Sequence, residues 1–287
     1  MENYISEYKN YLLITGKAET TVKQYTSIIV RFLEEYPKPK SITKPQLIQF
    51  MLRRGAARTI KQAHGALNHF FVGVLNSRAI KKIPQPKVSD FIPNILSEIE
   101  IQQVISNIPN LKHEAIIQLL YSCALRIGEV INLKVVDIGK TKNVIKIVSG
   151  KGNKTAYVPI PEATKNLLRE YYIKYKPKMY LFEGQNAPKY STSSIRKILK
   201  KALIKTNITK NIRVHDLRHS RATHWLEAGM DIKFVQQILR HKKLETTERY
   251  LHLTTDSLEY AMVSADNNIK ERYLIPYTTD NRKTIAA

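Results

Sequence analysis

The most informative stretch of the chain is residues 213–252, which read RVHDLRHSRATHWLEAGMDIKFVQQILRHKKLETTERYLH. On a helix His215 and Arg218 share one face because they are three residues apart. His241 and then Tyr250 follow further along the stretch. A guanidinium can clamp the non-bridging oxygens of a phosphate, imidazoles can move protons, and a phenol can act as a nucleophile. This set of side chains is what phosphoryl transfer on a nucleic-acid backbone would use.

The charge of the chain indicates a polyanionic partner. Its 287 residues include 47 lysines and arginines against 24 acidic residues, which gives a formal net charge of +23. Such an excess is more than solubility requires. Nucleic acid is favoured over an anionic membrane surface, because the basic residues are spread along the chain and not gathered on one amphipathic helix. The length suggests one large domain or two modest ones.

Cysteine usage and hydropathy exclude several other classes of protein. The lone Cys123 cannot form an internal disulfide, and its apolar neighbours predict a packed core residue in a reducing compartment. There is no N-terminal apolar region typical of a signal peptide and no run of 18 apolar residues, so no membrane is expected. Cys/His pairs at metal-ligand spacing are lacking as well. We therefore expect no metal and no cofactor.

The first 80 residues have the apolar periodicity of helices. Capping boxes are predicted at Thr21-x-x-Gln24 and at Thr43-x-x-Gln46. Basic side chains gather toward the end of this region, and the candidates for DNA contact are Arg53, Arg54, Arg58, Lys61, Lys81 and Lys82. These residues indicate either a helical module lying on DNA phosphates or an ordinary solvated face.

Residues 81–95 contain three prolines and three lysines but no glycine, which predicts an extended and fairly stiff connector over residues 83–95. It is either a plain linker or the strap of a clamp that closes around a duplex. We expect a helical domain over residues 1–82, this linker, a second domain over residues 96–263 and a C-terminal tail over residues 264–287.

The second domain is predicted to mix helices with a small sheet. A capping box at Ser97-x-x-Glu100 and an apolar helix over residues 112–124 open it. Period-two patterns predict three short strands over residues 134–138, 144–148 and 155–160. Helices are expected over residues 161–175, 191–205 and 214–227. The fold class is therefore mainly α with a small three-stranded antiparallel sheet.

Three further sites in this domain could carry function. Arg126 lies between Leu125 and Ile127 after an apolar helix, so it either points inward to an anion or pairs with an acid at the surface. Lys151 lies between two glycines of a predicted hairpin turn, where it either reaches a phosphate or is simply solvated. The outer face of the helix over 191–205 carries Arg196, Lys197 and Lys200, which suit DNA phosphates or plain solvent equally well.

Together these residues resemble the tyrosine recombinases, also called the phage integrase or Xer family. The family pattern of His-x-x-Arg, a Leu-Gly-His-like element and a tyrosine about nine residues later is similar to His215–Arg218, Leu239-Arg240-His241 and Tyr250. Its Arg-x-x-Glu element resembles Arg126 with Glu129. Its Gly-Lys-Gly-x-Lys hairpin resembles residues 150–154. One departure is Ala156, where the family often has an arginine that contacts the DNA backbone.

The resemblance implies a role for each residue. Arg126 and Arg218 would bind the scissile phosphate, and Tyr250 would attack it to form a 3′-phosphotyrosine bond. Lys151 would protonate the leaving 5′ oxygen, and His215 would assist as general acid/base. His241 would donate a hydrogen bond to the phosphate, Glu129 would orient His215, and Lys154 would contact DNA.

The resemblance also implies partners. These are double-stranded DNA with a specific site and a homotetramer held by C-terminal segments that dock on neighbouring protomers. The reaction would need neither metal nor ATP, and would take place on the nucleoid in the cytoplasm. Accessory proteins and the type of recombination stay open.

Three rival functions share parts of this pattern. A type IB topoisomerase would use the same chemistry as a monomer and without a specific site. A decayed integrase that only binds DNA would have lost some of the six catalytic residues. An RNA-binding helical protein would explain the positive charge but not the presence of all six catalytic residues.

Overall fold

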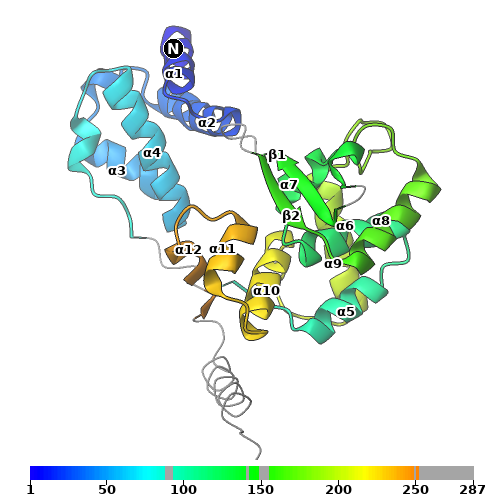
Figure 1. Cartoon of the computed structure of the whole chain (residues 1–287). Helices are drawn as coiled ribbons and strands as arrows, with labels where there is room; N and C mark the ends of the chain where they lie inside the picture. Colours follow the sequence, from blue (N-terminus) through cyan, green and yellow to red (C-terminus); the bar gives the residue numbers. More distant parts are fainter. Residues whose placement is uncertain (88–92, 140–141, 149–154, 249, 252–287) are drawn as a thin grey trace, which may run out of the picture. The chain divides into compact units, whose positions relative to one another are not determined.

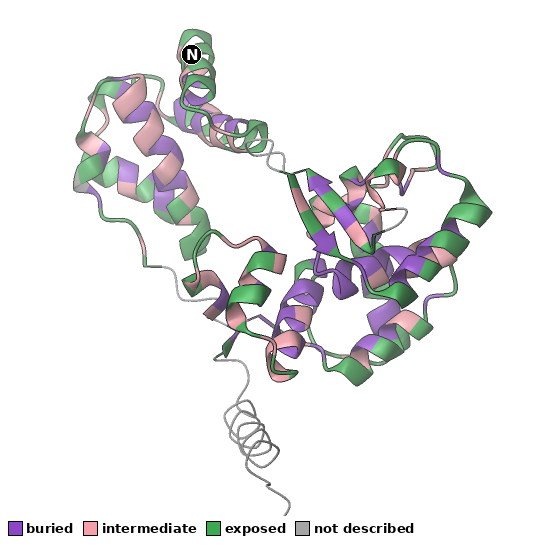
Figure 2. Cartoon of the chain, viewed as in Figure 1, coloured by how far each residue is buried: buried purple, intermediate pink, exposed green. Residues whose placement is uncertain are grey.

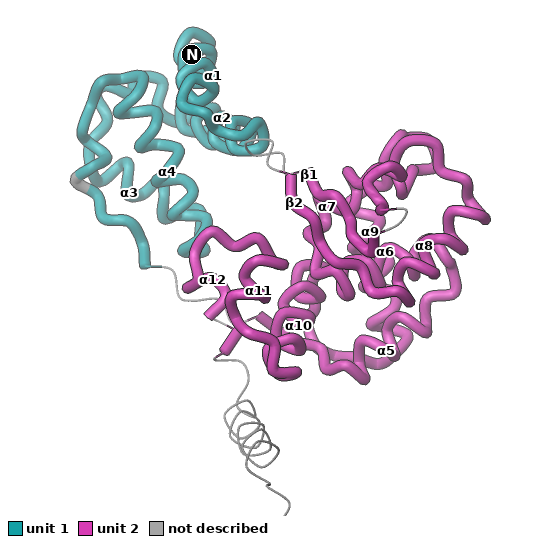
Figure 3. The backbone as a smooth tube through the Cα atoms, in the orientation of Figure 1, with its two compact units in different colours: residues 1–92 teal, residues 93–287 magenta. Residues whose placement is uncertain are grey.

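The computed structural model describes residues 1–87, 93–139, 142–148, 155–248 and 250–251, and divides the chain into two compact units, Met1–Ile92 and Pro93–Ala287 (Figures 1 and 3). Each described part has a hydrophobic core of its own. None of the helices in these ranges is long and apolar enough to cross a membrane.

The first unit is helical, as its periodicity predicts. Its elements are α1 (Glu2–Ile14), α2 (Glu19–Glu35), α3 (Lys44–Leu52), α4 (Ala57–Gly73) and the 3-10 turns η1 (Pro39–Ser41) and η2 (Ala79–Lys82). α4 packs against α1, α2 and α3 through a stripe that includes Leu67, Phe70 and Phe71. Phe32 of α2 meets Phe50 of α3 edge to ring, with centroids 5.1 Å apart.

The predicted capping boxes have different outcomes in the structure. Thr43 begins α3, and its backbone N–H donates to Gln46 Oε1 at 2.8 Å, which confirms this box. The box at Thr21 is wrong: α2 already begins at Glu19, with Ala18 as its N-cap. Gly16, with φ of +69°, ends the preceding turn, so the chain re-enters a helix within three residues.

The second unit combines helices with a two-stranded sheet. Its elements are α5 (Glu98–Ser106), α6 (Leu111–Ser122), α7 (Ile127–Asn132), η3 (Val135–Asp137), β1 (Val144–Val148), β2 (Thr155–Pro159), α8 (Glu162–Tyr175), α9 (Thr192–Lys205), α10 (Val214–Glu227), α11 (Ile232–Leu239) and α12 (Glu245–Glu248). The mainly α fold class is confirmed. β1 and β2 pair antiparallel, with Ile145 opposite Val158.

The predicted third strand is wrong. Residues 135–137 form the 3-10 turn η3, because Asp137 Oδ2 accepts a hydrogen bond from the Lys134 backbone N–H at 2.9 Å and closes the turn. Only isolated bridges remain, from Lys134 to Tyr180 and from Ile138 to Ile145. The sheet of the described residues therefore has two strands and not three.

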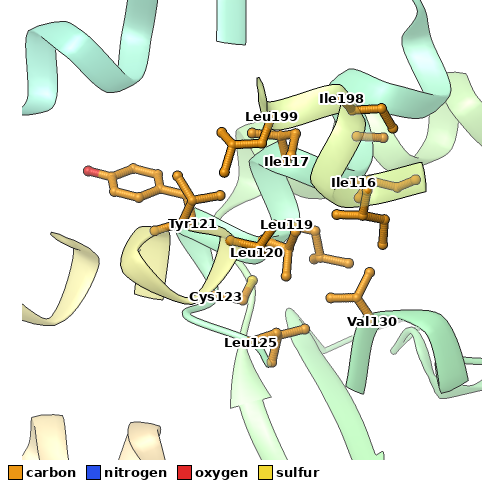
Figure 4. Close-up of a cluster of buried hydrophobic side chains, with 14 of the residues drawn as sticks. Ile116, Ile117, Leu119, Leu120, Tyr121, Cys123, Leu125, Val130, Ile198 and Leu199 are labelled. Atoms are coloured by element: carbon orange, nitrogen blue, oxygen red, sulfur yellow. The ribbon is translucent and has the colours of Figure 1, made fainter. Parts of the chain in front are cut away.

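α6 is the apolar helix expected over residues 112–124, and it lies in the middle of the second core (Figure 4). Cys123 follows it and is fully buried, which confirms the prediction of a packed core cysteine. Burial raises the pKa of its thiol to about 12, so the thiol stays protonated.

The start of the second unit is fastened to the segment that leads into α10 and to α10 itself. The Asn94 side chain donates to the Asn211 carbonyl at 2.9 Å, and Lys210 Nζ donates to the Ile95 carbonyl at 3.2 Å. The Leu96 backbone N–H donates to Ser220 Oγ of α10 at 3.0 Å. The confirmed capping box of Ser97 and Glu100 then begins α5.

Candidate active site

Helix α10 supplies the middle of the candidate site and buries polar side chains over much of its length (Figure 2). Asp216 starts it: this fully buried carboxylate accepts the Arg213 backbone N–H at 2.8 Å. Gly229, with φ of +79°, follows its last turn. The buried polar residues of the helix are Asp216, Arg218, His219, Ser220, Thr223 and His224.

Arg218 is a buried cation that lacks a carboxylate partner among the described residues. Its side chain is 1% exposed and donates to the backbone carbonyls of Ala124 and Leu239. Burial, and then the cations Arg126 and Arg240, lower the pKa of Arg218 to about 9, which still leaves it charged at pH 7. A buried charge of this kind is costly unless an anion compensates it. The surroundings of Arg218 are therefore suited to a phosphate.

Arg126 lies close enough to Arg218 to lower its pKa and is more exposed than Arg218. It precedes α7, and its Nη1 donates to Glu129 Oε1 at 2.8 Å. Burial alone would raise the pKa of Glu129, but Arg240 and Arg126 lower it below its usual value, so this carboxylate is ionised at pH 7. The contacts of Glu129 in the described chain are with these two arginines, and its role in orienting His215 stays a prediction.

His215 and His219 lie one turn apart on α10, with ring centroids 4.6 Å apart. Although His215 is exposed, the atoms packed against it lower its pKa, and Arg218 and Arg126 lower it further. Burial, together with His215, lowers the pKa of His219 to about 4. Both rings are therefore neutral at pH 7 and can accept a proton.

His219 also belongs to this cluster of side chains, although the sequence pattern did not single it out. Its Nδ1 lies 2.9 Å from the hydroxyl oxygen of Tyr250, and both side chains are buried. The signal available was its position four residues after His215, which places the two on one helix face. Nothing in the sequence reveals that a residue 31 positions away would meet it.

His241 and Tyr250 complete the described part of the site. His241 follows α11; its Nε2 lies 3.4 Å from Arg218 Nη2, and its Nδ1 lies 2.9 Å from Thr247 Oγ1. The Tyr250 ring is nearly parallel to the His241 ring, with centroids 6.4 Å apart. Tyr250 is only 1% exposed and packs with Ala222 and Val235.

The structure thus brings five of the six predicted catalytic residues into one region of the second unit. Arg126, His215 and His241 each lie near Arg218, and the Tyr250 ring lies beside His241. Lys151 and Lys154 lie outside the described residues, so their predicted roles stay predictions.

The predicted DNA-contact residues of the first unit have mixed surroundings. Arg53 is paired with Glu35 at 2.5 Å, and the Arg54 guanidinium lies 4.5 Å from the Phe50 ring centroid. The exposed ones are Arg53, Arg58, Lys61 and Lys81, and the Lys82 side chain is outside the described set.

A groove between α2 and α4, of about 450 Å³, adds two basic residues that the sequence reasoning missed, Lys23 and Arg31. Arg54 also lines this groove. Lys23 and Arg31 lie on α2, apart in sequence from the predicted basic cluster, and come next to Arg54 only because α2 packs against α4.

In the second unit Arg196, Lys197 and Lys200 are exposed on α9, as the helical pattern requires. Lys197 also lines a groove of about 440 Å³ with Lys201, Lys205 and the loop before α6. Their DNA contacts stay predictions.

Comparison with known proteins gives one consistent result for both units. The family described as "Phage integrase family" matches residues 94–257, and "Phage integrase, N-terminal SAM-like domain" matches residues 5–80. Tyrosine recombinase XerA of Pyrococcus horikoshii is 32% identical over 270 residues, covering 91% of this chain and 93% of the relative. A tyrosine recombinase of Thermosipho africanus is 32% identical over 273 residues, covering 88% and 96%.

Solved structures share the architecture. XerA recombinase matches with 26% identity and a TM-score of 0.55, covering 96% of this chain and all of that one. XerH bound to a palindromic difH substrate matches with 22% identity and a TM-score of 0.71, covering 84% and 78%. A lambda integrase tetramer bound to a Holliday junction matches with 15% identity and a TM-score of 0.73, covering 87% and 76%. The last two likenesses concern the fold.

Proposed function

The chain belongs to the phage integrase family and is a tyrosine site-specific recombinase, and from this premise we propose that Tyr250 forms the covalent bond to DNA. The observation that carries the proposal is Arg218. This buried guanidinium has no carboxylate partner in the described chain and lies within 3.4 Å of His241, near the buried phenol of Tyr250. A phosphate diester would supply the missing negative charge.

In the proposed reaction Arg126 and Arg218 hold the two non-bridging oxygens of the scissile phosphate and stabilise the charge of the transition state. The Tyr250 oxygen attacks phosphorus while the bond from phosphorus to the 5′ oxygen breaks. His215, which is neutral at pH 7, accepts the phenol proton, and Lys151 delivers a proton to the leaving 5′ oxygen. The 5′ hydroxyl of another strand then reverses these steps. Because the phosphotyrosine retains the energy of the diester, no ATP is needed.

His241 takes part through one of its two tautomers. To donate to a phosphate oxygen, its Nε2 must carry the proton, and its Nδ1 then accepts the hydroxyl hydrogen of Thr247 at 2.9 Å. Thr247 is fully buried, so this contact holds the ring in place.

The burial of Tyr250 adds a requirement to the proposal. A phenol that is 1% exposed and bonded to His219 cannot reach a phosphate on a bound duplex. Binding of DNA therefore has to expose the Tyr250 hydroxyl before the attack.

The proposed partner is double-stranded DNA that carries a specific site. In the first unit the groove lined by Lys23, Arg31 and Arg54 suits backbone phosphates, and the net charge of +23 supports a long contact with DNA. Four protomers would act together, in the manner of the lambda integrase tetramer. Docking of C-terminal segments between protomers and action on the nucleoid in the cytoplasm complete the proposal.

A covalent-adduct assay tests it. A nicked suicide duplex is incubated with wild type, Tyr250→Phe and Tyr190→Phe, and the products are separated on a denaturing gel. Tyr190 is the matched control, because its hydroxyl also lies against a histidine, 3.0 Å from His113 Nε2, but outside the site. We expect adducts with wild type and Tyr190→Phe, and none with Tyr250→Phe although it still binds DNA. An adduct with Tyr250→Phe would remove Tyr250 from the role of nucleophile.

A further inference from the structure

Position 240 holds an arginine where the backbone favours glycine. Arg240 is the C-cap of α11 and adopts the left-handed conformation, with φ of 55° and ψ of 42°. A side chain in this conformation costs free energy that glycine avoids, and helices commonly end in glycine for that reason. A long charged residue at such a position needs a compensating contact.

The guanidinium of Arg240 makes that contact with Glu129. Its Nη2 donates to Glu129 Oε2 at 2.6 Å, and its Nη1 donates to the Ile238 carbonyl at 3.2 Å. The Arg240 side chain is 16% exposed and that of Glu129 is 12% exposed, so water screens this ion pair only weakly. It joins the end of α11 to α7, two elements more than a hundred residues apart in sequence.

Glu129 also forms an ion pair with the guanidinium of Arg126. Oε1 accepts Arg126 Nη1 at 2.8 Å, and Oε2 also accepts the Arg126 backbone N–H at 2.8 Å. Among the described contacts, Nη1 is the one nitrogen of the Arg126 guanidinium that donates to this carboxylate. Arg240 occupies the remaining side of the carboxylate and is the charge that lowers the pKa of Glu129 the most.

We propose that Arg240 is a positioning residue that keeps Arg126 available for the scissile phosphate by occupying Glu129. This proposal rests on the proposed function, in which Arg126 binds that phosphate. Without Arg240, Glu129 Oε2 keeps its bond from the Arg126 backbone N–H but can accept a second hydrogen bond, and it lies next to the Arg126 guanidinium. An arginine and a carboxylate then favour a two-bond, fork-like pair. Arg126 would turn its remaining N–H groups to Glu129, and the carboxylate would compete with the phosphate.

The arrangement makes an unusual prediction for Arg240→Gly. Glycine relieves the strain of the left-handed backbone and Arg126 remains to pair with Glu129, so these effects offset the lost ion pair and the unfolding midpoint is expected to stay near that of wild type. Cleavage of a bound suicide duplex at saturating protein is expected to slow by on the order of 10-fold or more, because small misplacements of a catalytic group have effects of this size. A merely structural role would instead lower the unfolding midpoint and leave the rate of the bound complex unchanged.

Lys176→Gly is the matched control. Lys176 is an exposed cation at the C-cap of α8 in the same left-handed conformation, with φ of 45°. Its replacement removes one positive charge and the same kind of backbone strain away from the site. We expect the cleavage rate of Lys176→Gly to equal that of wild type.

The decisive variant is the double mutant Arg240→Gly with Glu129→Gln. A neutral amide attracts Arg126 far less than a carboxylate, so the double mutant is expected to cleave faster than Arg240→Gly alone. Arg240→Asn, which also tolerates the left-handed backbone, repeats the test if the glycine variant does not fold. An Arg240→Gly rate equal to wild type, or a double mutant slower than Arg240→Gly, would overturn the inference. A wild type that forms no adduct would instead count against the proposed function.

Discussion

Helices α4 and α10 each pack against several helices of their own unit, yet they bury opposite kinds of side chain. α4 buries alanines, Leu67, Phe70 and Phe71, with His64 as its one buried polar residue. α10 buries six polar or charged residues, Arg218 and His219 among them. Apolar burial stabilises a fold, whereas polar burial costs free energy unless each group finds a partner. The difference indicates that α4 stabilises its unit through apolar burial, while α10 holds charged and proton-accepting groups in place through hydrogen bonds.

The largest effect is expected when α10 is made to resemble α4. Arg218→Met replaces the buried cation by an apolar chain of similar length. Adduct formation should fall by about 10³-fold, which is about 4 kcal/mol of transition-state stabilisation. The free energy of unfolding should stay the same or rise, because the desolvation cost of the charge disappears. Single-turnover cleavage gives the rate, and urea unfolding followed by Trp225 fluorescence gives the stability. A large loss of stability would show that α10 depends on this cation as α4 depends on its apolar stripe.

The converse change is Leu67→Ala in α4. Because Leu67 is fully buried, we expect the first unit to lose about 2–5 kcal/mol of unfolding free energy. The single tryptophan, Trp225, lies in the second unit, so its transition should keep its midpoint while the helical signal in circular dichroism acquires an earlier one. A Trp225 midpoint that falls together with the first unit would mean that the two cores do not unfold separately.

A smaller effect, dependent on pH, is expected for His219→Asn. Above pH 6.5 the His219 ring is neutral in both the folded and the unfolded chain. Between pH 6.5 and its folded pKa of about 4, only the unfolded chain binds the proton, so the wild type loses stability as the pH falls, by up to about 3 kcal/mol. Asparagine still accepts the Tyr250 hydroxyl but does not titrate. In urea titrations, the unfolding free energy of the wild type minus that of His219→Asn should therefore decrease from pH 7 to pH 4; a difference that does not change with pH would contradict the burial of a neutral ring.

The sequence predicts α4 more completely than it predicts α10. The apolar stripe at helical spacing predicts which face of α4 is buried, and the structure confirms that prediction. In α10 the residue types indicate chemistry but not contacts. Arg218 donates to the backbone carbonyls of Ala124 and Leu239. Every residue has a backbone carbonyl, so residue types do not indicate which carbonyls a side chain will contact. His219 was missed for the same reason, since its partner lies on a different element.

The wrong prediction of a third strand has a local cause. Val135 and Val136 have high strand propensity, but Asp137 bonds back to the Lys134 backbone and turns the chain. The resemblance to a family supplied the order of Arg126, His215, Arg218, His241 and Tyr250. It gave no indication of what an arginine at position 240 would do, because that position departs from the Leu-Gly-His pattern.

The three hydrogen bonds that fasten residues 94–96 have a mechanical consequence. The covalent connection between the units enters the second unit at this point, and its first anchors are Asn211, Lys210 and Ser220 of α10. Ser220 is two residues from Arg218 and one from His219. A pull or a twist transmitted along the connection is therefore applied to α10, which carries Arg218 and His219, and to the segment that leads into it.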